Sequence, residues 1–117
     1  MNPNELKQRS KSFALRIIKL SESLPKTVSG RALAAQIVRS GTSVAANYRS
    51  ACRARSKAEF LARMGVVEEE ADETALWLEL IGESKLMPQV RLADLLEEAN
   101  ELTAIMASFR KTAAARH

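Results

Sequence analysis

The chain has few of the residues from which catalytic and redox sites are usually built. Its 117 residues include one cysteine, Cys52, and one histidine, the terminal His117, which is not interpreted as catalytic. A single cysteine excludes an internal disulfide, and no Cys/His cluster or nucleophile–base pair can form. We therefore expect no enzyme activity, no cofactor and no metal. Cys52 falls on the apolar arc of an expected helix, which predicts a buried small side chain.

Long apolar runs and aromatic residues are also scarce. No run approaches the ~18–20 apolar residues of a membrane-spanning helix, and the N-terminal segment lacks the basic-then-apolar order of a secretory signal. We therefore expect a cytoplasmic protein with no membrane partner. Aromatic residues make up 4% of the chain and prolines number three, whereas Ala, Leu, Glu, Lys and Arg are abundant. This composition is typical of an all-α fold.

Apolar residues recur at helical spacing in four segments. Helices are expected at about residues 4–24, 29–53, 57–83 and 88–111. Short turns favour one up-down-up-down antiparallel four-helix bundle over residues 1–117. Pro25 ends the first helix, and Thr27 or Ser29 caps the second. Pro88 is placed at the first position of the fourth, whose residues after about Lys111 are expected to fray.

Two further signals concern the second and third helices. Gly41 costs roughly 1 kcal/mol relative to alanine inside a helix, so its place on the inner arc predicts that another helix passes close by. Ser56 and Glu59 match the S-x-x-E capping box, in which each side chain satisfies the other residue's free backbone N–H. The third helix is therefore expected to begin near Lys57.

The third helix carries apolar residues on more than one side, which indicates a helix that is either central in the bundle or buried against a partner. The residues off its core stripe form the predicted oligomer interface: Leu61, Leu76, Trp77 and Leu80. The acidic run at residues 68–73 is interpreted as solvated or facing an interface. Di-iron bundles combine such acids with Glu-x-x-His motifs, and no histidine follows these.

Charge is divided unevenly along the chain. Residues 1–63 hold 13 Lys/Arg against three acids, residues 64–101 hold two against 11, and the whole chain has a formal net charge of +4. This split suggests either an anionic partner for the basic half or head-to-tail charge matching between subunits.

Arginines of the second helix fall within about 80° of one another at ~100° per residue. With the following turn they give seven candidate contacts: Arg31, Arg39, Arg49, Arg53, Arg55, Lys57 and Arg63. The face is either a solvated helix side or a phosphate-binding surface, because arginine forks bind phosphate oxygens bidentately. Tyr48, the nearby aromatic, lies on the inner arc, so contacts to the nucleic-acid backbone are expected rather than base stacking. The leading hypothesis is non-catalytic binding of RNA or DNA, with RNA favoured; the alternative is a protein-interaction adaptor ring.

This stretch resembles the signature of the 23S ribosomal RNA intervening-sequence protein family, which includes the accessory variability protein of diversity-generating retroelements. Its members show R-x-x-x-S-I-P-x-N-I-x-E-G followed by R-x-S-x-x-E-F. The matching positions are Arg39, Ser43, Asn47, Ser56, Glu59 and Phe60; Val44 stands at the first isoleucine, and Arg55 lies one residue after the position of the second arginine. The family's proline is Ala45 here, and its Glu-Gly pair is Ser50-Ala51.

The resemblance implies a four-helix bundle that assembles into a barrel-shaped homopentamer with a basic, nucleic-acid-binding surface. The glycine that would end the second helix in family members is absent here, so the end of that helix near Arg53 is only loosely specified.

Overall fold

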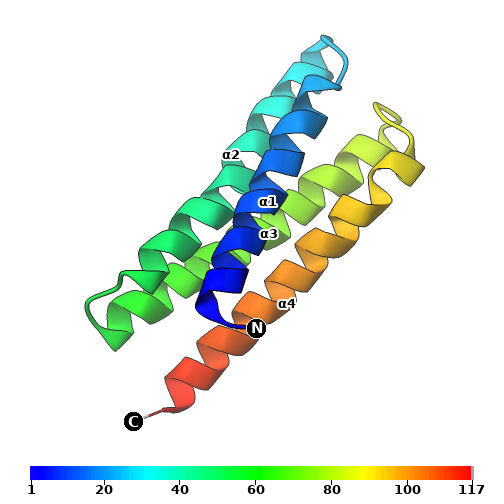
Figure 1. The fold of residues 1–117 in the computed structure, drawn as a ribbon. Helices are drawn as coiled ribbons and strands as arrows, with labels where there is room; N and C mark the ends of the chain where they lie inside the picture. Colours follow the sequence, from blue (N-terminus) through cyan, green and yellow to red (C-terminus); the bar gives the residue numbers. More distant parts are fainter. Residues whose placement is uncertain (117) are drawn as a thin grey trace.

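The computed structural model describes residues 1–116, and four α-helices account for most of that range (Figure 1). The helices are α1 (Pro3–Glu22), α2 (Val28–Cys52), α3 (Lys57–Glu83) and α4 (Ala93–Ala115), and a short 3₁₀ turn, η1 (Gln89–Arg91), precedes α4. Successive helices run in opposite directions along a rod of 50 × 21 × 19 Å. The predicted all-α four-helix bundle is therefore confirmed. No helix in residues 1–116 is long and apolar enough to cross a bilayer.

One apolar core runs the length of the rod. The predicted stripe of α1 is buried throughout: Leu6, Phe13, Ile17, Leu20 and Leu24. α3 packs against both α2 and α4, whereas α1 packs mainly against α2 and touches α4 much less. A bidentate ion pair links the two loosely packed helices, since Arg9 donates from Nε and Nη2 to Glu98 at 2.8 and 2.6 Å. An ion pair therefore connects α1 to α4, the two neighbouring helices with the least apolar packing between them.

Gly41 marks a close approach of α2 to α1, as predicted. A Cβ atom built at this glycine would lie 2.8 Å from Cγ2 of Ile17, which is fully buried. That separation is far below the ~3.5–4.0 Å optimum for carbon atoms. The absence of a side chain at Gly41 therefore lets the two backbones pack closely, and this close packing offsets the lower helix propensity of glycine.

Side chains cap the N-termini of both α2 and α3, but one predicted capping bond at α3 is replaced by another. Thr27 caps α2, and its Oγ1 accepts from the Gly30 N–H at 3.1 Å. Ser56 caps α3, as predicted, by accepting from the Glu59 N–H at 3.1 Å. The reciprocal bond predicted at Ser56 is wrong, because the Glu59 carboxylate accepts from the Arg55 N–H, also at 3.1 Å. The Glu59 carboxylate thus stabilises the turn at Arg55, one residue before the Ser56 N–H that a capping box would use.

Both predicted ends of the fourth helix were wrong. Pro88 has an extended ψ of 136° and precedes η1, so α4 begins only at Ala93. At the other end α4 continues to Ala115. The Lys57 ammonium donates to the carbonyl oxygens of Ala114 and Arg116, two groups that a helix end leaves unsatisfied. The side chain of another helix therefore supports a turn that was expected to fray. His117 lies outside the described residues.

Cys52 is exposed, so its predicted burial was wrong. The buried stripe of α2 follows a seven-residue spacing through Ile37, Val44 and Ala51. Such spacing rotates the core face by ~20° per heptad relative to a straight helix. In the last turn of α2, Ala51 therefore faces the core and Cys52 faces solvent.

Lys85 follows α3 with φ 63°, in the left-handed region. The Leu86 N–H donates to the Ile81 carbonyl and the Lys85 N–H to the Gly82 carbonyl, both at 3.1 Å. These bonds form a Schellman motif, whose left-handed position favours glycine. We expect Lys85→Gly to raise the free energy of unfolding by about 1 kcal/mol, measured by urea denaturation. Lys85→Ala, which keeps the strain, should give little gain; an equal gain in both variants would contradict this prediction.

Candidate nucleic-acid interface

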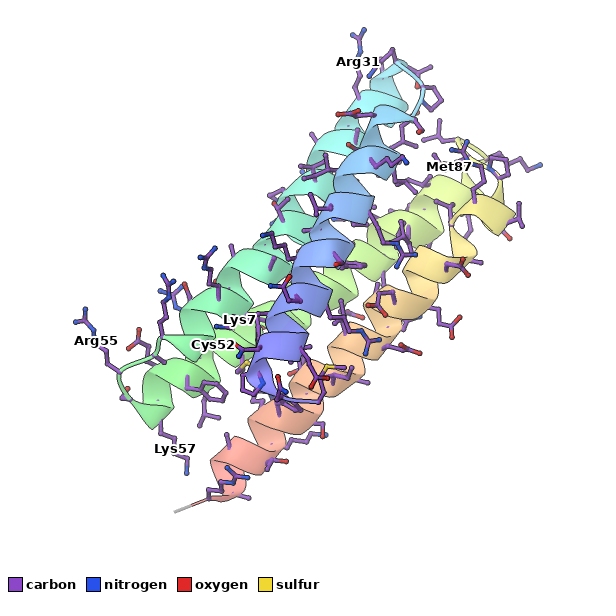
Figure 2. All side chains as sticks on the ribbon, viewed as in Figure 1. Lys7, Arg31, Cys52, Arg55, Lys57 and Met87 are labelled. Carbon is purple, nitrogen blue, oxygen red and sulfur yellow. The ribbon has the colours of Figure 1, made fainter. Side chains whose placement is uncertain are left out.

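The seven predicted cations do not form one surface. Arg31 projects at one end of the bundle, whereas Arg55 and Lys57 lie at the other (Figure 2). Eighteen residues of helix separate Arg31 from Arg49, which is ~27 Å at 1.5 Å per residue. Arg31 is therefore remote from the arginines that it was predicted to flank.

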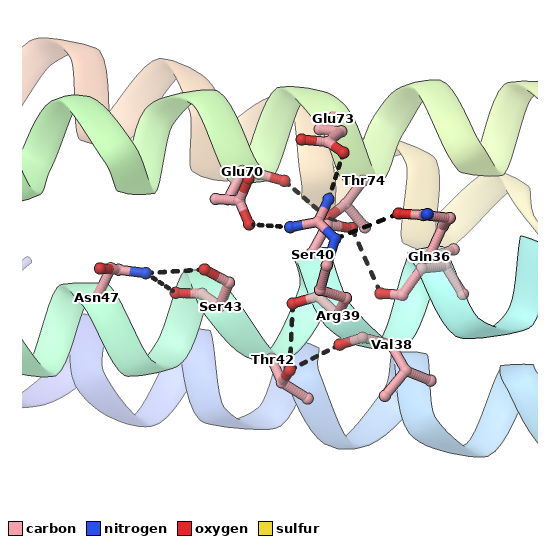
Figure 3. A network of polar contacts seen from close by, with 11 residues as sticks. Gln36, Val38, Arg39, Ser40, Thr42, Ser43, Asn47, Glu70, Glu73 and Thr74 are labelled. Atoms are coloured by element: carbon pink, nitrogen blue, oxygen red, sulfur yellow. Dashed lines mark hydrogen bonds and ion pairs between the residues drawn. The ribbon is translucent and has the colours of Figure 1, made fainter.

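Arg39 is held by carboxylates of α3. Its Nη1 donates to Glu70 at 2.9 Å, its Nη2 pairs with Glu73, and its Nε donates to Gln36 at 3.2 Å (Figure 3). Two acids thus oppose one guanidinium. Arg39 fastens α2 to α3 and offers little free charge to an external phosphate.

A buried polar contact lies beside this ion pair. The hydroxyl oxygens of Ser40 and Thr74 are 2.8 Å apart, and Thr74 Oγ1 also lies 2.7 Å from the Glu70 carbonyl oxygen (Figure 3). Both residues are fully buried. Buried hydroxyls need partners, so this contact fixes the register of α2 against α3.

Two other predicted contacts are also engaged within the bundle. Lys57 is bonded to the end of α4, as described above. Arg63 Nη1 donates to the Asn47 side-chain oxygen at 3.5 Å. Asn47 in turn donates to the Ser43 carbonyl at 3.0 Å and to the Ser43 hydroxyl at 2.7 Å. Ser43, Asn47 and Arg63 therefore form a chain of hydrogen bonds that connects α2 to α3.

Arg49 and Arg53 line a groove between α1 and α2, and Arg55 lies outside it. The groove has a volume of about 490 Å³. Its lining residues are Asn4, Lys7, Gln8, Lys11, Ala14, Thr42, Ala45, Ala46, Arg49 and Arg53. Four of them are cationic and none is acidic. Within residues 1–116, the side chains of these four cations have no ion pair or hydrogen bond. The groove is therefore a concentrated, uncompensated positive site.

The sequence prediction missed Lys7 and Lys11. They are four residues apart and so share one side of α1, a spacing that is visible in the sequence. What places them opposite Arg49 and Arg53 is the rotation of α1 about its own axis when it packs on α2. No single-helix pattern contains that rotation.

Two cations outside the groove, Arg9 and Arg110, do have acidic partners. Hydrogen bonding to Glu98 is the largest cause that raises the pKa of the Arg9 guanidinium, and Glu68, bonded at 2.8 Å, raises the pKa of Arg110.

Burial is the main cause that raises the pKa of Tyr48. Tyr48 is 2% exposed, so its ring is not available for stacking on a base.

The predicted interface residues of α3 divide into two kinds. Leu76 and Leu80 are 46% and 40% exposed, one helical turn apart. Leu61 and Trp77 are partly buried, and Trp77 packs against the core. Trp77 Nε1 is buried and has no hydrogen-bond partner within residues 1–116. Leu76 and Leu80 therefore form a small exposed apolar patch, whereas Trp77 Nε1 is enclosed by the chain itself.

Comparisons with known proteins agree with this architecture. A crystal structure of a protein of unknown function from the S23 ribosomal protein family of Bacteroides thetaiotaomicron VPI-5482 has a TM-score of 0.87 and 32% sequence identity, with 95% of this chain and 99% of that chain covered. No curated protein sequence matches the chain. The family described as 23S rRNA-intervening sequence protein matches residues 3–108, nearly the whole bundle. The chain therefore belongs to the 23S rRNA-intervening sequence protein family.

Proposed function

We propose that this bundle is a non-catalytic nucleic-acid-binding protein, with RNA favoured over DNA, that holds phosphates at the end where α2 meets the α2–α3 turn. The observation that carries the proposal is the contrast between paired and unpaired cations. Arg39 is neutralised by two acids, whereas Arg49 and Arg53 have no acidic partner within residues 1–116. Arg55 extends the same positive end of the bundle (Figure 2). The ribosomal RNA in the family's name supports RNA as the ligand.

The chemistry of these side chains indicates what they would recognise. Arginine forks make charge-assisted contacts with phosphate oxygens, and such contacts carry no base-specific information. Because Tyr48 is buried, this end of α2 supplies no aromatic platform. Binding should therefore tolerate different sequences and depend steeply on salt. If about six phosphates are engaged, affinity should fall on the order of 10³-fold between 50 and 200 mM salt.

The test is Arg49→Glu/Arg53→Glu, measured as Kd for RNA and for DNA across this salt range. Both side chains are exposed, so the variant should remain folded. Its affinity should fall by about tenfold or more at 50 mM salt, because each lost contact was charge-assisted. The matched control, Arg16→Glu/Lys19→Glu, changes the charge equally on an exposed part of α1 and should bind much more tightly than the test variant.

Undiminished binding by Arg49→Glu/Arg53→Glu, or no binding by the wild type at 50 mM salt, would overturn the proposal. The cationic end of α2 would then serve a protein partner, as in an adaptor ring, or remain solvated. A pull-down before and after nuclease treatment separates these cases, because an adaptor keeps its partner after nuclease.

A further inference from the structure

The groove between α1 and α2 differs from the open end of the bundle around Arg55. Its floor is made of small side chains, Ala14, Ala45 and Ala46, which leave space between the two helices. Its walls carry two cations each, Lys7 and Lys11 from α1 and the two arginines from α2. A ligand in the groove would therefore meet positive charge from both sides.

The spacing of the cations suits a linear anion. Lys7 and Lys11 are one turn apart on α1, as are Arg49 and Arg53 on α2, so each pair repeats at ~6 Å along its helix. The two helices run in opposite directions, and the start of α1 lies beside the end of α2 (Figure 1). Two rows of cations thus follow the groove, which matches a chain of phosphates better than one isolated phosphate.

The size of the groove limits which nucleic acid can enter. About 490 Å³ is the volume of a small-molecule pocket. Packed helices lie ~8–10 Å apart, so the space between α1 and α2 suits one strand better than the much wider duplex. Asn4 and Gln8 also line the groove, and their amides can hydrogen-bond to ribose hydroxyls or base edges of a single strand.

We infer that the α1–α2 groove is a subsite for single-stranded nucleic acid, with Lys7 and Lys11 as phosphate contacts in addition to the arginines of α2. This inference rests on the proposed function and deepens it. The open cations near Arg55 can reach the phosphates of any nucleic acid, whereas the groove admits one strand. The groove therefore gives the protein a preference for single-stranded over double-stranded RNA.

Two variants test the groove independently. Lys7→Gln/Lys11→Gln removes its α1 charges, and Ala45→Leu/Ala46→Leu fills its floor without changing charge. The probes are a short unstructured single-stranded RNA and an RNA duplex of the same length, at 50 mM salt. Both variants should weaken single-strand binding by about tenfold while duplex binding changes by less than about twofold. Lys19→Gln/Lys26→Gln, which removes equal charge outside the groove, should leave the ratio of the two affinities unchanged.

The outcomes separate the groove from the general function. Thermal melts first establish that each variant is folded. If the wild type binds RNA but the groove variants keep its ratio of single-strand to duplex affinity, the groove subsite is overturned and the proposed function stands. If the wild type binds neither RNA, both fail together. Equal weakening on both RNAs by the lysine variant, with no effect of the filling variant, would assign the lysines to general electrostatics and also overturn the subsite.

Discussion

Gly41→Val is expected to lower the free energy of unfolding by about 3 kcal/mol, the upper part of the range for overpacked cores. The Cβ atom alone would lie 2.8 Å from Cγ2 of Ile17, and valine adds two more methyl groups. Ile17 is fully buried in the second half of α1, where the close-packed interior resists displacement of its side chain. The helices must therefore separate, and urea denaturation should show a lower midpoint with an unchanged slope.

Gly65→Val is the matched control for this prediction. Gly65 also lies inside a helix, α3, but a Cβ atom there would meet nothing within 4 Å. Valine and glycine both have low helix propensity, so the free energy of unfolding should change by less than about 0.5 kcal/mol. If both substitutions had the same effect, the cost would come from helix propensity and not from the α1–α2 approach.

Much of this fold could be predicted because its periodicity is strong. The stripe from Leu6 to Leu24 and the close approach at Gly41 both follow from apolar residues at helical spacing. The errors arose where spacing is a weak guide. Cys52 was misplaced because the core face drifts along α2 through a seven-residue repeat. Pro88 was misplaced because it opens a 3₁₀ turn before α4, and both placements suit proline's fixed φ.

The candidate site was harder to predict for a different reason. The sequence identifies arginines on one side of α2, but not the groups that they meet. Arg39 reaches α3 and is neutralised by Glu70 and Glu73, whereas Arg49 faces α1 and its lysines. These residues are ten apart, so their side chains point about 80° apart around the axis of α2. That difference in direction gives them different neighbours, which only the packed bundle identifies.

The internal ion pairs explain how a chain with many acids keeps a basic groove. Acidic residues of α3 and α4 are engaged by Arg9, Arg39 and Arg110. These pairs fasten helices together on the sides away from the groove, which is lined only by α1 and α2. Both of those helices belong to the basic half of the chain. The uneven charge along the sequence therefore becomes a local positive site in the folded chain.

We propose that the chain forms a homo-oligomer, with the pentamer favoured by the family resemblance. Leu76 and Leu80 expose apolar surface on α3, and a second copy could cover these two leucines. Each added copy would also repeat the cationic groove, so that one RNA strand could engage several grooves at once.

Leu76→Glu/Leu80→Glu should therefore abolish both assembly and avidity. Light scattering at micromolar concentration should give the 12.9 kDa mass of one chain, because burying two carboxylates at an apolar contact is prohibitive. RNA affinity should fall by about 10²-fold or more through lost multivalency. Val28→Glu/Val90→Glu adds the same charge at two isolated valines that are 90% and 83% exposed, and should leave the assembly intact. A wild-type mass of one chain would contradict the homo-oligomer, and a variant that remains assembled would place the interface elsewhere on the bundle.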